Sequence, residues 1–99
     1  MEDVPAFLEQ LEEQDAEFAE LIAKTRAWSR ADGALSAKTK ALIAMAVDAA
    51  CEHPDGVESL AAAAREEGAT NDEVVEAIEI VTSMCGLQGL ATGANAFSE

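Results

Sequence analysis

Three side chains in this 99-residue chain could act as nucleophiles or bases near neutral pH: Cys51, His53 and Cys85. A thiol becomes a nucleophile and a redox group once it loses its proton, and an imidazole exchanges protons near neutral pH. Cys51 and His53 are two residues apart, about 200° of rotation on a helix, so they face apart in continuous helix. Pro54 favours a helix end at about Glu52, which would free His53.

Both cysteines also have a structural interpretation, because an unpaired cysteine often acts as a small buried hydrophobe. Cys51 lies at the end of an apolar segment, and Cys85 continues an apolar stripe through Val74, Ile78 and Val81. A disulfide between the two would require Cα atoms about 4.4–6.8 Å apart. The sequence therefore leaves open whether these residues are core, reactive thiols or a disulfide pair.

His53 is the only histidine, and its structural interpretation is an exposed loop residue beside Pro54. A metal site would have to combine it with the neighbouring acids Glu52 and Asp55, which is a weak ligand set. We expect no metal and no cofactor. The catalytic candidates are therefore Cys51, His53 and Cys85.

The elements that position these residues are predicted to be helices, because no stretch alternates with period two as a strand would. Apolar residues recur every three or four positions over residues 5–30, and the polar run at 12–15 could divide that segment. Pro5 suits a first helical turn. Further helices are predicted over about 37–52, from 55 to Gly68, from Thr70 to Cys85 and over about 87–97.

Capping residues support these boundaries. Ser36 is an expected N-cap, and Thr70 with Glu73 has the spacing of a capping box. Asp55 with Glu58 has the same spacing. Gly33 and Gly68 are expected to end helices in the left-handed conformation.

Length and composition predict one all-α domain over residues 1–99 that forms oligomers. Alanine fills 22 positions, against 3 Phe and 1 Trp. Alanine favours helix but contributes little buried area. A small domain with so light a core would gain stability from contacts between subunits.

The charge balance is strongly acidic, with 20 Asp and Glu against 6 Lys and Arg and a net charge of −14. Such a chain is repelled by nucleic acids and anionic membranes. We expect a surface adapted to high intracellular salt, as in halophilic proteins; a surface that steers a cationic partner is the alternative. We find no signal peptide and no apolar run of about 20 residues, so we expect a cytoplasmic protein.

Four segments carry a family resemblance: 35–47 (LSAKTKALIAMAV), 62–70 (AAAREEGAT), 73–78 (EVVEAI) and 84–91 (MCGLQGLA). Together they resemble the core of the carboxymuconolactone decarboxylase and alkylhydroperoxidase-D-like family, most strongly over residues 35–97. The resemblance implies an all-α fold of five to six helices. It also implies association through the central helices as a trimer or hexamer, with an active site between those helices.

The resemblance also identifies what this chain lacks. The family's redox branch has a Cys-x-x-Cys pair and a His four residues later, and these positions correspond to His53, Gly56 and Leu60 here. In the decarboxylase branch, Gly56 corresponds to an acid and Leu60 to a His. Neither set of residues is present.

Three functions remain open. The first is a degenerate, non-redox family member that binds a small ligand between helices. The second is an antioxidant enzyme of peroxiredoxin type that uses Cys51 with Cys85 or His53. The third is a structural or partner-binding helical oligomer. A decarboxylase of a lactone acid is least supported, because Arg65 is the only arginine after residue 30 to bind a carboxylate.

Overall fold

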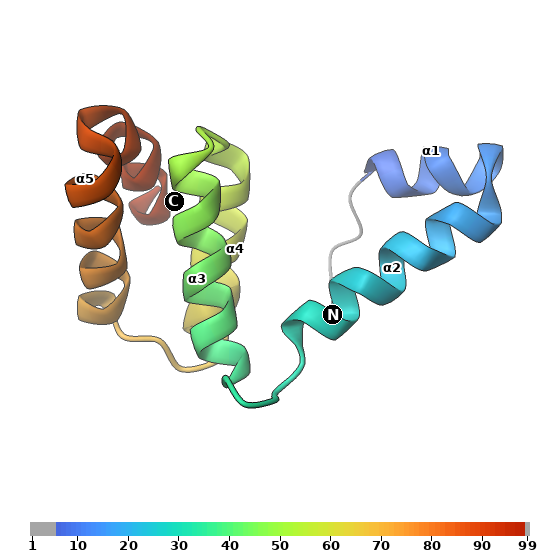
Figure 1. Ribbon diagram of the computed structural model, residues 1–99, viewed down its shortest axis with the longest axis horizontal. Coiled ribbons are helices and arrows are strands. Elements are labelled where there is room, and N and C mark those ends of the chain that lie inside the picture. The colour runs from blue at the N-terminus through green and yellow to red at the C-terminus, as the bar shows by residue number, and fades with distance from the viewer. Residues whose placement is uncertain (1–5, 99) are drawn as a thin grey trace. The chain divides into compact units, whose positions relative to one another are not determined.

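The computed structural model describes residues 6–98, and this part of the chain is all-α, as predicted (Figure 1). The helices form two compact units, one up to Ala31 and one from Asp32. The elements in chain order are α1 (Ala6–Gln14), α2 (Ala16–Arg30), α3 (Ala37–Ala50), α4 (Pro54–Glu66), α5 (Asn71–Gly93) and the short 3₁₀ turn η1 (Ala94–Phe97). No strand occurs within residues 6–98. The expected place of Pro5 in a helical turn lies outside the described residues.

The first unit is a helical hairpin, since the segment over 5–30 does divide. Asp15 separates α1 from α2 and caps α2 by accepting a hydrogen bond from the Phe18 N–H (3.1 Å). Among residues 6–31, only Leu8 and Ala19 are buried. Four of the unit's large apolar side chains are exposed: Phe7, Phe18, Leu21 and Trp28.

The second unit holds the main core, which is built from α3, α4, α5 and η1. Met45, Val57 and Val74 are its largest fully buried side chains, and each comes from a different helix. Alanines fill much of the remaining interior, which lets the helices approach closely. The expected inner stripe of the helix after Thr70 is confirmed at Val74, Ile78 and Val81.

Several predicted helix ends are confirmed. Ser36 caps α3 by accepting from the Thr39 N–H (3.1 Å), and Gly68 has φ +99°. Thr70 and Glu73 form both bonds of the capping box, at 2.8 and 3.1 Å. The box fixes the start of α5.

Two predicted caps are wrong. Gly33 does not take a positive φ; instead α2 ends at an extended Ala31. Asp55 does not cap α4, because an N-cap at Asp55 requires a helix that begins at Gly56, and α4 begins two residues earlier, at Pro54. His53 holds the N-cap position, and no side chain makes a capping bond there.

α5 is a helix with a sharp break. Gly86 has φ 72° and ψ −157°, a conformation that is essentially restricted to glycine. The chain turns back at this point, so that the two halves of α5 form a hairpin (Figure 1). The last helix predicted over 87–97 is thus the returning half of α5 followed by η1.

Within residues 6–98, one helical segment is long and apolar enough to cross a membrane by length and composition alone. This segment is Asn71–Phe97, 27 residues long, and its most apolar 18-residue window has a mean hydropathy of 1.4. The sequence contains no uninterrupted apolar run there, because small and polar residues alternate with the apolar ones. A core helix also passes this test, and the break at Gly86 divides the segment into two shorter helices.

Candidate functional site

The turn between α3 and α4 brings together two polar side chains at the position where the resemblance implies an active site. Nδ1 of His53 lies 3.1 Å from Oδ1 of Asp48. A backbone hydrogen bond joins the same two residues: the His53 N–H donates to the Asp48 carbonyl (2.8 Å). The Asp48 side chain is 25 % exposed and that of His53 is 64 % exposed. The pair therefore lies at the surface with its carboxylate partly covered.

Gly56 supplies the space for this carboxylate. A Cβ built on Gly56 would clash with Oδ2 and Cγ of Asp48. Because Gly56 lies in the first turn of α4, the bare backbone there lets the Asp48 side chain lie against α4 beside His53. Gly56 stands at the position of the family's second cysteine. Its missing side chain thus leaves room for Asp48, the residue that binds His53.

The turn also contains an unusual backbone conformation. Glu52 has φ 62° and is the only residue other than glycine with a positive φ in the described chain. Such a conformation is uncommon outside glycine, asparagine and aspartate. It ends α3 and directs the chain into His53, with the Cys51 N–H still donating to the Val47 carbonyl (2.9 Å).

The hydrogen bond fixes the chemistry available to His53. An ionised carboxylate only accepts, so Nδ1 carries the proton that binds Asp48. In the neutral ring Nε2 then bears a lone pair and can accept a proton from a ligand or a water. A pair of this kind suits proton transfer or the binding of a hydrogen-bond donor.

The two cysteines are free thiols and both are exposed. Their interpretation as buried core residues is therefore wrong. Cys51 follows the last residue of α3 and turns outward with the chain. Cys85 does not extend the Val74 stripe inward, because the helix breaks one residue later at Gly86.

The ends of α3 and of the first half of α5 lie at the same end of the second unit (Figure 1). Cys51 and Cys85 lie at these two helix ends, and both are free thiols rather than a disulfide pair. Cys51 sits at the carbonyl end of α3, and that end of a helix dipole does not favour an anion. In the family's redox branch the first cysteine corresponds to His53 instead, at the start of α4.

Leu60, at the position of the family's histidine, is half-buried and packs against the core. His53 therefore has its titratable partner, Asp48, on α3, and the leucine on α4 does not supply another. Among residues 6–98, no group of three or more His, Cys, Asp and Glu side chains is placed to hold a metal ion.

Sequence reasoning missed Asp48. The available signal was its position as the only charged residue between Lys40 and Glu52, within an otherwise apolar helix. A carboxylate in such a helix is costly unless it is paired or partly solvated. Asp48 meets both conditions, since it binds His53 and keeps a quarter of its side chain in water.

Comparison with known proteins identifies a curated relative and a family. A curated relative, "Uncharacterized protein 4 in cox locus" of Paracoccus denitrificans, is 46% identical over 54 residues. The match covers 54% of this chain and 49% of the relative, so the chain spans about half of that protein's length. No solved structure matches significantly. The model of the carboxymuconolactone decarboxylase family matches residues 16–99, and the chain belongs to that family.

Proposed function

We propose that this protein is a non-redox member of its family, in which His53 and Asp48 replace the thiol pair as the functional group. The pair would accept a proton or a hydrogen bond from a small ligand at the junction of α3 and α4. The observation that carries the proposal is the 3.1 Å contact between His53 Nδ1 and Asp48 Oδ1, at the position of the family's first cysteine.

Two further features support this function. Gly56 removes the side chain that would displace Asp48, so the pair is matched to its surroundings. Cys51 lies at the end of α3 rather than at a helix start, where the helix dipole would help to activate a redox thiol. The site thus has a positioned imidazole and lacks an activated thiol.

The first experiment asks whether the chain reduces peroxides. Purified protein is incubated with an alkyl hydroperoxide and a dithiol reductant, and Cys51 and Cys85 are then examined by mass spectrometry. We expect no catalytic consumption of peroxide. Turnover that is lost in Cys51→Ser, with His53→Asn active, would contradict the non-redox function.

The second experiment tests the pair itself. The ring nitrogens of His53 are observed by ¹⁵N NMR at a pH where the ring is neutral. We expect a protonated Nδ1 and an unprotonated Nε2, with this tautomer lost or mixed in Asp48→Asn. A ring protonated at Nε2 in the wild type would overturn the pairing. Asp55→Asn is the matched control, because Asp55 is a nearby acid that does not bind the ring.

The exposure of both thiols favours a thiol peroxidase as the second candidate. The Cys51 thiolate would attack the terminal peroxide oxygen, giving a sulfenate and releasing the alcohol. The Cys85 thiol would then displace water to form a disulfide, which an external dithiol would reduce. Oxidation with peroxide alone distinguishes this candidate, since it would yield an intramolecular disulfide that is absent in Cys85→Ser.

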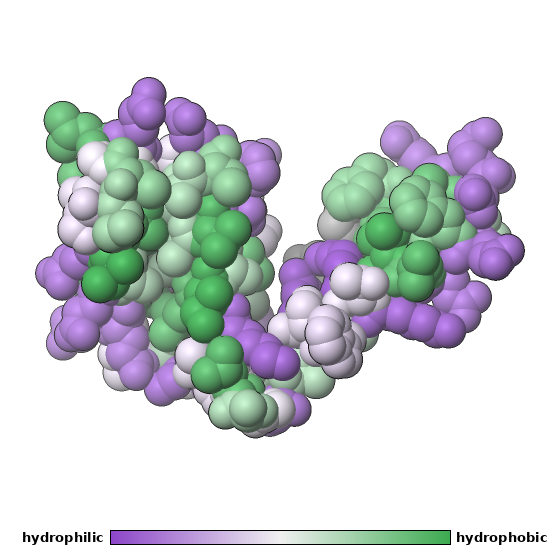
Figure 2. Space-filling model, in the orientation of Figure 1, coloured by the Kyte–Doolittle hydropathy of each residue, from purple (hydrophilic) through white to green (hydrophobic). Residues whose placement is uncertain are grey.

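We also propose that the chain assembles as a homo-oligomer, a trimer or hexamer, in a cytoplasm of high salt. The second unit has an apolar surface over α3 and α5 (Figure 2). Ile43 and Val47 of α3 contribute to the exposed apolar area, as do Ile80, Met84 and Leu87 of α5. Met84 and Leu87 are about 80 % exposed, which is costly for large side chains that remain in water.

A further inference from the structure

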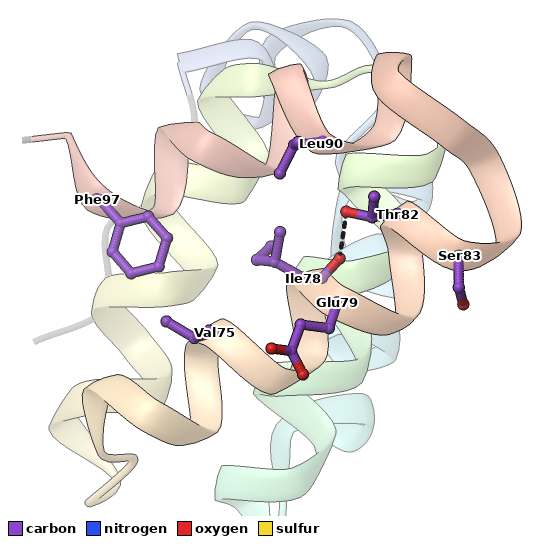
Figure 3. A pocket seen from close by; sticks show the side chains of 7 residues that line it. All are labelled: Val75, Ile78, Glu79, Thr82, Ser83, Leu90 and Phe97. Carbon is purple, nitrogen blue, oxygen red and sulfur yellow. Dashed lines mark hydrogen bonds between the residues drawn. The ribbon is translucent and has the colours of Figure 1, made fainter.

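A cavity of about 450 Å³ lies between the two halves of α5, away from the His53 site. Such a volume is within the range of small-molecule sites. Figure 3 shows Leu90 and Phe97 of the returning chain across from Val75, Ile78 and Glu79 of the first half. The remaining lining residues are Thr82 and Ser83.

The cavity depends on the hairpin in α5. Gly86 reverses the chain, and Gly93 lies so close to Ile78 that an added Cβ would come within 2.8 Å of its Cδ1. The halves therefore touch at Ile78 and leave space beside it. Arg65 fixes the far wall by donating to the Ala96 carbonyl (2.8 Å) and stacking on the Phe97 ring, 5.7 Å from its centre.

The lining is apolar except for one charge. The Thr82 hydroxyl donates to the Ile78 carbonyl (2.8 Å) and the Ser83 hydroxyl to the Ile80 carbonyl (2.9 Å), so both protons are already bound. Glu79 is the only ionisable side chain in the lining. None of the described residues forms an ion pair or hydrogen bond with its carboxylate.

The cavity faces a different direction from the apolar surface proposed to bind other subunits. On a helix that advances about 100° per residue, the lining residues Thr82, Glu79 and Ser83 project about 40–140° round from Ile78. Ile80 and Met84 project about 200–240° round. A second copy seated on the Ile80–Met84 side would therefore leave the cavity open.

These features combine hydrophobic walls with a single unpaired carboxylate in a chain of net charge −14. Anionic ligands are disfavoured by both charges, and a neutral ligand gains at most a hydrogen bond from Glu79, without the charge attraction available to a cation. We infer that the α5 cavity is a binding site for a small organic cation: an apolar or aromatic body carrying an amine that pairs with Glu79. This site is separate from the proposed function at His53.

The test compares three probes that share one body: phenylbutylamine, phenylbutanol and phenylbutyrate. Each is titrated into the 99-residue protein at low ionic strength, by calorimetry and by NMR of the Thr82, Leu90 and Phe97 amides. We expect the amine to bind about fivefold or more tightly than the alcohol, as one partly exposed charge pair allows. Phenylbutyrate should bind more weakly than both.

The variants assign the contacts. Glu79→Gln should remove the preference for the amine and leave the alcohol's affinity unchanged. Glu76→Gln is the matched control, because it removes the same charge from the same helix outside the cavity and should keep most of the preference. Ser83→Trp, which fills the mouth of the cavity, should abolish binding of all three probes.

Three results would overturn the inference. The first is no saturable binding of the amine by the wild-type protein. The second is equal affinity for the amine and the carboxylate. The third is binding that perturbs the His53 region and is unaffected by Ser83→Trp.

Discussion

The Asp48 carboxylate occupies the space that a side chain at Gly56 would need, and from there it binds His53 Nδ1 at 3.1 Å. Two helices thus share one small volume, which either the Asp48 carboxylate or a Cβ on α4 can fill. The family's second redox cysteine falls at Gly56. A thiol there and the His53–Asp48 pair are therefore mutually exclusive in this backbone.

Gly56→Ala should break the pair without unfolding the protein. Alanine is favoured over glycine in a helix by up to about 1 kcal/mol, which offsets the loss of one hydrogen bond of about 1 kcal/mol. We expect the free energy of unfolding to change by no more than about 1 kcal/mol. The His53 ring nitrogens, observed by NMR, should lose their single tautomer.

Gly33→Ala is the control for this substitution. A Cβ at Gly33 would lie 3.6 Å from Lys40 Nζ, an ordinary contact, and Gly33 does not take a positive φ. It should leave the His53 ring unchanged. A Gly56→Ala variant with the wild-type tautomer would contradict the steric argument.

Gly86→Ala should destabilise the protein and disturb the α5 hairpin. Holding alanine at φ 72° and ψ −157° costs about 1–3 kcal/mol, although nothing lies close enough to clash with its Cβ. Chemical denaturation measures the loss. Gly68→Ala is the control, because Gly68 also has a positive φ (+99°) but lies outside the hairpin. Both substitutions should lower the free energy of unfolding. Only Gly86→Ala should also abolish probe binding in the cavity.

The helices and most of their caps could be predicted from the sequence, since caps such as Ser36 and Thr70 act within one turn. Gly33 and Asp55 were mispredicted because the same residue types also occur beside helix ends without capping them. The break at Gly86 was predicted, since the expected helices end at Cys85 and begin again at about 87, but the reversal of the chain there was not. Glycine occurs both inside helices and at breaks, and packing between the two halves of α5 decides which applies.

The site could be predicted only in part. His53 was identified from its residue type, but its partner lies five residues earlier on another helix. Only the turn through Glu52 brings Asp48 and His53 together. The exposure of Cys51 and Cys85 likewise depends on where α3 ends and where α5 breaks. The apolar pattern of the sequence continues past both points, so it does not show that these two side chains are exposed.

The capping box of α5 predicts a pH dependence of stability. Hydrogen bonds from the Thr70 backbone N–H and from Lys38 hold the pKa of Glu73 below its usual range. A lowered folded pKa contributes stability that is present above the unfolded value, near pH 4.3. The contribution is lost as the pH falls through the lower folded value.

Urea denaturation of the wild type and Glu73→Gln between about pH 3 and 7 tests this dependence. The wild type should be the more stable protein at neutral pH, and the difference should shrink as the pH falls below about 4. Glu76→Gln corrects for the general loss of charge repulsion. A difference that stays constant with pH would contradict the role of the ionised Glu73.

The net charge of −14 predicts that salt stabilises the fold. Asp72, Glu76 and Glu79 lie three and four residues apart along α5, so they repel one another. The free energy of unfolding should rise by at least about 1 kcal/mol between low and molar potassium chloride. The slope should be smaller in Glu76→Gln. A stability that falls with salt would contradict the high-salt adaptation.

Met84→Glu should dissociate the proposed oligomer, because it places a charge within an apolar surface that subunits would cover. Met84 is 80 % exposed and its neighbours on that surface, Ile80 and Leu87, are exposed as well. Ser83→Glu adds the same charge on the cavity side, about 100° round the helix, and should leave the assembly intact. Sedimentation velocity at micromolar protein in molar salt measures both variants, with circular dichroism as the check on folding. Dissociation by Ser83→Glu with no effect of Met84→Glu would place the subunit contact on the cavity side, and a monomeric wild type would contradict assembly altogether.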